Sequence, residues 1–133
     1  PNSNVTGLDI VDVVLPEYRR PDINYVICDI NEFKTREMYD IIIDDGSHWL
    51  KDVVHSVVLL SKHLKLGGVM IIEDVQNSKT WLPTIRTLVS TQLEYNQGFR
   101  WLVGVYNGSE EGLEDNFLII LKRELSKYLI SLI

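Results

Sequence analysis

The sequence has few of the residues that mark disulfide-bonded or membrane-spanning proteins. Its single cysteine, Cys28, excludes an internal disulfide, and within an apolar run it is expected to pack as a small hydrophobic residue in a reducing compartment. No apolar run approaches the ~20 residues needed to span a bilayer. Residues Pro1–Asn4 lack the charged and apolar regions of a signal peptide. These absences predict a cytoplasmic protein without a membrane partner.

Positive charge is also scarce. The chain has 13 Lys and Arg residues against 19 Asp and Glu, which gives a net charge of −6. Because the basic residues are scattered, no basic stripe is available to bind a phosphate backbone, and we expect no nucleic-acid partner. The length of 133 residues, with 45% apolar and 24% charged residues, fits one domain with an ordinary core.

What the sequence does contain is a series of short apolar runs rich in Val and Ile. The runs are nearly continuous rather than alternating, which is typical of parallel strands covered on both faces. Four of them end in acids: Val5–Asp9, Tyr25–Asp29, Tyr39–Asp45 and Val69–Asp74. If these runs are parallel strands, their acids lie at the carboxyl edge of one sheet, where open α/β folds bind ligands.

Helical patterns and further strands surround these runs. Apolar residues at three- and four-residue spacing predict a helix over 50–64, ended by Gly67 and Gly68, and a second helix over 80–93 with Pro83 in its first turn. The remaining expected elements are two short helical turns, two strands, a polar loop and a C-terminal helix: Pro16–Arg20, Ile30–Glu37, Phe99–Tyr106, Phe117–Leu121, Asn107–Asn116 and Glu124–Ile133.

The acids at the strand ends are candidates for binding a cation and a cofactor. Neighbouring strands lie about 5 Å apart, so these like charges repel unless a cation or a hydrogen-bonding ligand lies between them. Asp45, Glu73 and Asp74 form an oxygen-only set that suits Mg²⁺ or Ca²⁺ better than zinc. Asp9 and Asp29 are placed like the acids that hold the ribose of a nucleotide-type cofactor. The alternative for each acid is to cap the following helix.

His48 lies three residues after Asp45, on the turn that enters the first expected helix. It should therefore face the same crevice as the acids and is placed to act as a general base. The alternative is a histidine that caps or packs at the start of the helix. Ser47 is expected to be the helix N-cap, and Trp49 and Trp81 either line an apolar pocket or pack in the core.

Two stretches, YDIIIDDGSH at 39–48 and LKLGGVMIIED at 64–74, together resemble the class I S-adenosylmethionine-dependent methyltransferases. More narrowly, they resemble the metal-dependent sugar O-methyltransferases of macrolide biosynthesis and their relatives, some of which are labelled cephalosporin hydroxylases. The specific motifs run from Val5 to Gln76, and the pattern of strands and helices continues to Leu121. The resemblance implies an α/β fold with a Rossmann-like sheet, mostly parallel with an antiparallel C-terminal strand.

The resemblance also implies roles for the site residues. Asp45, Glu73 and Asp74 match Mg²⁺ ligands, although another hard divalent cation fits the same set. His48 matches a catalytic base that deprotonates a hydroxyl of a sugar or other small molecule for attack on the sulfonium methyl group. Three acids match contacts of S-adenosylmethionine, at its ribose, its adenine and its methionine end respectively: Asp9, Asp29 and Asp44.

One part of the family pattern is absent. The first strand and its glycine-rich turn, which cradle the cofactor, would precede Val5, and nothing here resembles them. In the fold that strand lies between the strands that end in Asp9 and Asp45, and a sheet without it has unpaired backbone groups. We therefore expect residues 1–133 to form a single partial domain, completed by an N-terminal segment or by another subunit, with a homo-oligomer as one form.

Two other functions remain open on the sequence. The first is a catalytically inactive remnant of a methyltransferase that serves as an interaction module. The second is a different metal-dependent enzyme, such as a hydrolase or a hydroxylase. An oxygenase would need two histidines and one carboxylate, and only His48 is well placed for that set.

Overall fold

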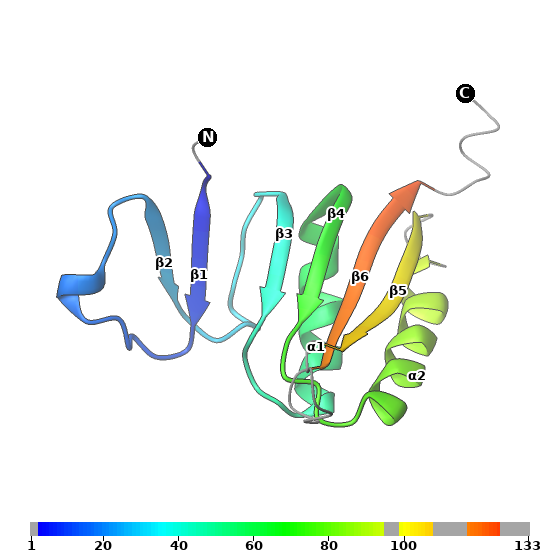
Figure 1. Ribbon diagram of the computed structural model, residues 1–133. Coiled ribbons are helices and arrows are strands. Elements are labelled where there is room, and N and C mark those ends of the chain that lie inside the picture. The colour runs from blue at the N-terminus through cyan, green and yellow to red at the C-terminus, as the bar shows by residue number, and fades with distance from the viewer. Residues whose placement is uncertain (1–2, 95–98, 108–116, 126–133) are drawn as a thin grey trace. The chain divides into compact units, whose positions relative to one another are not determined.

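The computed structural model describes residues 3–94, 99–107 and 117–125 (Figure 1). The chain divides into two compact units, Pro1–Thr35 and Arg36–Ile133, and each is described by itself. Nearly all of the expected polar loop and of the expected C-terminal helix lies outside the described residues.

The first unit is built on a two-stranded parallel sheet. Strands β1 (Val5–Asp9) and β2 (Ile23–Ile27) pair in register from Val5↔Ile23 to Asp9↔Ile27. The connection between them contains the short 3₁₀ helix η1 (Pro16–Tyr18), which confirms the turn predicted there. The second predicted turn, Ile30–Glu37, forms only at its start, because hydrogen bonds to the Asp29 carbonyl close a turn over 29–33 and no helix continues beyond it.

The second unit contains a four-stranded sheet in the order β3-β4-β6-β5. Its strands are β3 (Tyr39–Asp44), β4 (Leu64–Ile72), β5 (Phe99–Asn107) and β6 (Phe117–Leu125). Strands β3 and β4 are parallel, whereas β6 is antiparallel to both of its neighbours. Three strands therefore run in one direction and only β6 runs in the other. This confirms the expected mostly parallel sheet with an antiparallel C-terminal strand.

Helices α1 (Leu50–Leu60) and α2 (Ser78–Leu88) contact each other and help to form one core. Two short segments extend them, the 3₁₀ helix η2 (Ser61–His63) and the π-helix η3 (Val89–Glu94). The core contains buried residues from both helices and three strands: Val53, Val57, Leu64, Met70, Ile72, Trp81, Ile85, Leu88, Trp101, Ile119 and Leu121.

The opposite face of the sheet is less covered than the sequence predicts. In β3, Ile42 packs against the core, but its neighbours Ile41 and Ile43 are 61% and 56% exposed. The near-continuous apolar run indicated a strand buried on both faces. Within the described residues, that expectation is wrong for β3, because both helices of this unit contribute to the core on the Ile42 side.

Two expected helix boundaries are also wrong. The first helix ends at Leu60, and Leu64, Gly67 and Gly68 belong to β4 instead of stopping the helix. Gly67 has a φ of +80° where the pairing of β3 with β4 shifts register. The second helix starts at Ser78, so Pro83 is its sixth residue and lies beyond the first turn. There Pro83 lacks the N–H that would continue the helical hydrogen bonds.

A buried arginine on β6 contacts the first residues of β4 and β5. Arg123 of β6 donates a hydrogen bond to the carbonyl oxygen of Leu64, and its guanidinium lies 3.9 Å from the ring centroid of Phe99. Burial lowers the pKa of Arg123 from its ordinary value, because desolvation disfavours the charged form. The cation–π contact offsets part of that cost.

Substitution of Gly68 tests the close approach of β3 to β4. A Cβ atom at Gly68 would lie 2.9 Å from the Lys65 carbonyl oxygen and 3.0 Å from that of Asp40. We expect Gly68→Ala to lower the free energy of unfolding by about 1–3 kcal/mol in urea denaturation. The matched control is Gly104→Ala in β5, where no atom lies within 4 Å of the added carbon. Equal losses in the two variants would contradict this packing.

Candidate functional site

The site is built on the ends of two neighbouring parallel strands. Asp44 is the last residue of β3 and pairs with Ile72 at the end of β4. The Glu73 N–H donates to the Asp44 carbonyl oxygen at 3.0 Å, so the two segments stay paired as they leave the sheet. The residues that follow Asp44 and Glu73 are both acids, Asp45 and Asp74. Parallel pairing thus brings the two acids to the same edge.

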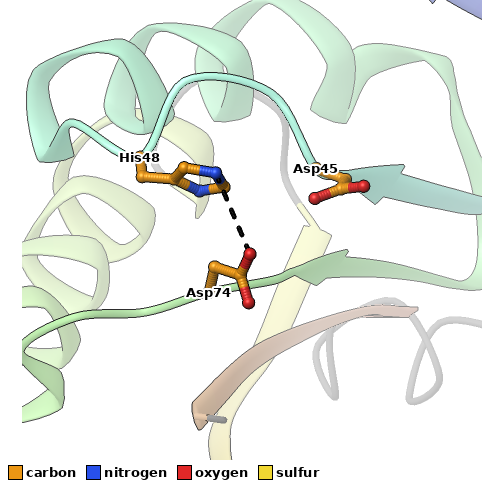
Figure 2. A group of neighbouring side chains, drawn as sticks. All are labelled: Asp45, His48 and Asp74. Atoms are coloured by element: carbon orange, nitrogen blue, oxygen red, sulfur yellow. Dashed lines mark ion pairs between the residues drawn. The ribbon is translucent and has the colours of Figure 1, made fainter. Parts of the chain in front are cut away.

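Three side chains converge at this edge, as Figure 2 shows. Asp45, His48 and Asp74 each offer one ligand atom, and these atoms all lie within 4.8 Å of one another. The closest ionic contact joins His48 Nε2 to Asp74 Oδ2 at 3.8 Å. All three residues are exposed to solvent, so a small molecule or an ion has access to them.

The backbone of Asp74 is unusual. Its φ is +50°, in the left-handed region, and among the described residues it is the one non-glycine residue with a positive φ. Such a conformation is uncommon for a residue with a side chain, and it persists where the surrounding structure imposes it, often at functional sites. The strained turn follows β4 directly and presents Asp74 to His48 (Figure 2).

The donor set fits a divalent cation. Mg²⁺ binds oxygen atoms at about 2.1 Å, so two ligand atoms on opposite sides of the ion lie about 4.2 Å apart. For Ca²⁺, which binds at about 2.4 Å, the same separation is about 4.8 Å. The observed separations, at most 4.8 Å, are within reach of both ions after small side-chain movements. Carboxylate oxygens suit Mg²⁺, Ca²⁺ and Mn²⁺, whereas an imidazole nitrogen favours transition metals.

The converging set differs in one member from the ligand set predicted from the sequence. Asp45 and Asp74 belong to both sets. Glu73 is half-buried and is not part of the converging group, in which the third atom comes from His48. Glu73 contributes a backbone contact instead, through its N–H bond to Asp44. His48 therefore lies where both a ligand and a general base could act.

The acids predicted to bind the cofactor lie in two places. Asp9 is the last residue of β1, and Asp29 lies two residues after β2 in the first unit. The Cys28 N–H donates to the Asp9 carbonyl oxygen at 2.9 Å. Asp9 Oδ1 accepts a hydrogen bond from the Val11 N–H, and Asp29 Oδ1 accepts from the backbone and the side chain of Asn31. Each acid thus stabilises its own turn.

Asp44 is in the second unit, and its carboxylate is already engaged. Its Oδ1 accepts from the Gly46 N–H at 3.3 Å, and its Oδ2 accepts from the hydroxyl of Ser56 on α1. The sequence analysis did not identify Ser56. The available signal was a serine placed beside Val53 and Val57 on the apolar face of the helix.

Comparison with known proteins gives one sequence relative. The sequence matches no model of a known protein family. It is 35% identical over 81 residues to an 8-demethyl-8-alpha-L-rhamnosyl tetracenomycin-C 2'-O-methyltransferase of Streptomyces olivaceus. The match covers 56% of this chain and 21% of that protein, so the chain spans about a fifth of its curated relative.

Solved structures show the fold more fully. MycE, a methyltransferase from the mycinamycin biosynthetic pathway, matches with a TM-score of 0.60 and 22% identity over 92% of this chain and 37% of that one. The N-methyltransferase NodS from Bradyrhizobium japonicum WM9 matches with a TM-score of 0.55 and 15% identity, over 91% of this chain and 73% of that one. The chain has the class I methyltransferase fold.

This methyltransferase fold confirms the resemblance inferred from the two sequence motifs, and the tetracenomycin relative is itself an O-methyltransferase. The finding agrees with the place of the candidate site, at the carboxyl ends of β3 and β4. In open α/β folds this edge is where ligands bind. In the described residues, the methyltransferase fold contains no helix that is long and apolar enough to cross a membrane.

Three further residues of the methyltransferase fold had been given roles from the sequence: Ser47, Trp49 and Trp81. Ser47 was expected to cap α1, but its hydroxyl donates to Asp52 Oδ2 at 2.7 Å, and the N-cap position is Trp49, which makes no side-chain cap bond. Trp49 is 76% exposed, whereas Trp81 is buried in the core. The core alternative therefore holds for Trp81.

Cation binding tests the convergence of the three side chains. We expect Mg²⁺ or Ca²⁺ to raise the melting temperature, since a ligand at 100 times its Kd adds about 2.7 kcal/mol of stability. Asp74→Asn should abolish the rise, measured by calorimetry. Asp40→Asn is the control, because Asp40 is an exposed β3 acid paired with Lys65. A rise of equal size in Asp74→Asn would contradict a cation site here.

Proposed function

We propose that this chain is part of an S-adenosylmethionine-dependent O-methyltransferase that transfers a methyl group to a hydroxyl of a sugar or another small molecule, with the help of a divalent cation. The observation that carries the proposal is the convergence of Asp45, His48 and Asp74 at the carboxyl ends of two parallel strands of a methyltransferase fold. We further propose that residues 1–133 form one partial domain of a cytoplasmic enzyme.

The relatives support this choice of reaction and cofactor. The tetracenomycin relative is a 2'-O-methyltransferase that acts on a rhamnosyl compound. MycE has been determined in complex with Mg and SAH, and also with Mg, SAH and mycinamycin VI. These properties belong to those proteins, and they support the same chemistry here because the fold is shared and this chain has a carboxylate pair suited to Mg²⁺.

Asp45 and Asp74 would hold the cation, with Glu73 beside them as the proposed third ligand. A divalent cation at this position supplies Lewis acidity, which lowers the pKa of a neighbouring hydroxyl. Glu73 precedes Asp74 on the same turn and is half-buried. Because its carboxylate is not part of the converging group, Glu73 would have to change its side-chain rotamer to reach the cation.

His48 is the proposed general base. Its Nε2, which faces Asp74, accepts the proton of the acceptor hydroxyl. Bound S-adenosylmethionine would supply the methyl group to this oxygen, with its carbon–sulfur bond broken and S-adenosylhomocysteine as the leaving product. The proton remains on His48 until solvent removes it. Because His48 is exposed, it can exchange protons with water between turnovers.

Cofactor contacts are proposed for three acids. Asp9 would bind the ribose hydroxyls and Asp29 would lie near the adenine, since Asp9 ends β1 and Asp29 comes just after β2, at the carboxyl edge of the two-stranded parallel sheet. Asp44 stays a prediction as a contact of the methionine end. Its two carboxylate oxygens accept hydrogen bonds within the protein, and this favours a structural role for the carboxylate.

Exchange of His48 separates catalysis from metal binding. In the full-length protein, we expect His48→Gln to lower the rate of S-adenosylhomocysteine release by about 10²–10⁴-fold, the contribution of a general base. Affinity for Mn²⁺, measured by electron paramagnetic resonance, should stay within a few fold. His63→Gln, on η2, is the matched control.

The same measurement decides which residue is the third ligand. Glu73→Gln should weaken Mn²⁺ binding if Glu73 completes the set with Asp45 and Asp74. If His48→Gln weakens Mn²⁺ binding and Glu73→Gln does not, His48 is a ligand and the base lies elsewhere. Full turnover in His48→Gln would remove this residue from the mechanism.

A second candidate function is an interaction module without activity. The observation that favours it is the exposed apolar pair Ile41 and Ile43 on β3, an edge strand that pairs only with β4 among the described residues. Such an edge accepts a strand from another segment or from a second copy of the chain.

Calorimetric titration with S-adenosylhomocysteine discriminates the two functions. We expect the full-length methyltransferase to bind it, and Asp9→Asn to weaken binding by about tenfold through loss of a charged hydrogen-bond acceptor. Asp12→Asn is the control, since Asp12 pairs with Arg19 on the same connection. Absence of any binding by the full-length protein would favour the interaction module.

A further inference from the structure

We propose that Asp44 and Ser56 form a positioning pair that holds Asp45, His48 and Asp74 in place for cation binding. The pair touches neither the cation nor the reacting atoms and acts through the backbone of the turn. This inference rests on the proposed function, because it concerns the same cation site.

Asp44 connects every segment that contributes to the site. Its carbonyl oxygen accepts from the N–H of Glu73, the residue before Asp74. One carboxylate oxygen accepts from the N–H of Gly46, inside the turn that carries Asp45 and His48. The other accepts from the hydroxyl of Ser56 on α1. The strand ends, the turn and the helix are thus joined at one residue.

Ser56 supplies the anchor on the helix. It is 5% exposed, and its single hydroxyl proton has two acceptors within reach, Asp44 Oδ2 and the Val53 carbonyl oxygen at 3.0 Å. The helix already uses the Val53 carbonyl for its own hydrogen bonding, so the bond to Asp44 is the one that links two elements. A half-buried carboxylate also needs such donors to offset its lost hydration.

Loss of the Ser56 hydroxyl should loosen the turn without dismantling the core. Among the described residues, the Asp44 carboxylate would then keep the Gly46 N–H as its donor, and it would turn toward solvent. Asp45 and His48, which follow on the same turn, would then sample more positions. Groups that orient metal ligands in this way typically change metal affinity by ten- to a hundredfold when they are removed.

The chain provides a matched control for a buried serine. Ser61, on η2, is fully buried, and its hydroxyl has no hydrogen-bond partner among the described residues. Ser61→Ala removes the same atom as Ser56→Ala from the interior of the same unit. The two variants differ in whether the lost hydroxyl reaches Asp44.

The experiment measures Mn²⁺ affinity by electron paramagnetic resonance in the full-length protein without cofactor. We expect Ser56→Ala to raise the Kd by about ten- to a hundredfold, and Ser56→Thr, which keeps the hydroxyl, to restore most of the affinity. Ser61→Ala should bind Mn²⁺ like the wild type. Circular dichroism and the melting temperature report whether each variant is folded. If Ser56→Ala does not fold, Asp44→Asn replaces it, with the same expected loss of affinity.

The outcomes separate this inference from the proposed function. Wild-type affinity in Ser56→Ala, or in Asp44→Asn where that variant is needed, would overturn the positioning role and leave the cation site intact. Equal losses in Ser56→Ala and Ser61→Ala would also overturn it, because the effect would then come from core packing. Failure of the wild type to bind Mn²⁺ would overturn both the positioning role and the cation site.

Discussion

The hydrogen bond from the Glu73 N–H to the Asp44 carbonyl oxygen is the contact on which the site depends. It continues the pairing of β3 with β4 at the ends of both strands, so that the two segments leave the sheet side by side. Asp45 follows Asp44, and Asp74 follows Glu73. Two neighbouring carboxylates repel each other. This hydrogen bond opposes the repulsion, because it holds together the two backbone segments that carry the acids.

The charge at this edge explains why a cation belongs to the proposed chemistry. Asp45 and Asp74 are exposed and have His48 as their neighbour, so the site attracts positive charge while it remains open to an acceptor molecule. The left-handed backbone of Asp74 is held in place at the same point. A strained backbone lowers the stability of the fold, so its presence at the end of a core strand is better explained by the position that it gives the Asp74 carboxylate.

Much of the fold could be predicted from the sequence, because core helices and strands have distinct apolar spacings. Trp81, Ile85 and Leu88 are buried on α2 as their spacing indicates. The boundaries were harder to predict. Leu64 continues the apolar spacing of the helix, yet it belongs to β4 and pairs with Tyr39 of β3, before the register shift at which Gly67 has a positive φ. Local spacing cannot show which strand a segment will meet, since that contact is long-range.

The sequence by itself determined that acids follow the strands and that a histidine follows Asp45 on the turn, because these facts depend only on residue order and strand direction. The tertiary structure decided which of these groups meet. The sequence predicted the ligand set Asp45, Glu73 and Asp74, whereas the ligand atoms that lie within 4.8 Å of one another are those of Asp45, His48 and Asp74. The reason is physical: the left-handed turn at Asp74 and the bonds of Asp44 to Gly46 and Ser56 set where each side chain lies, and both arise only when strand, turn and helix are packed together.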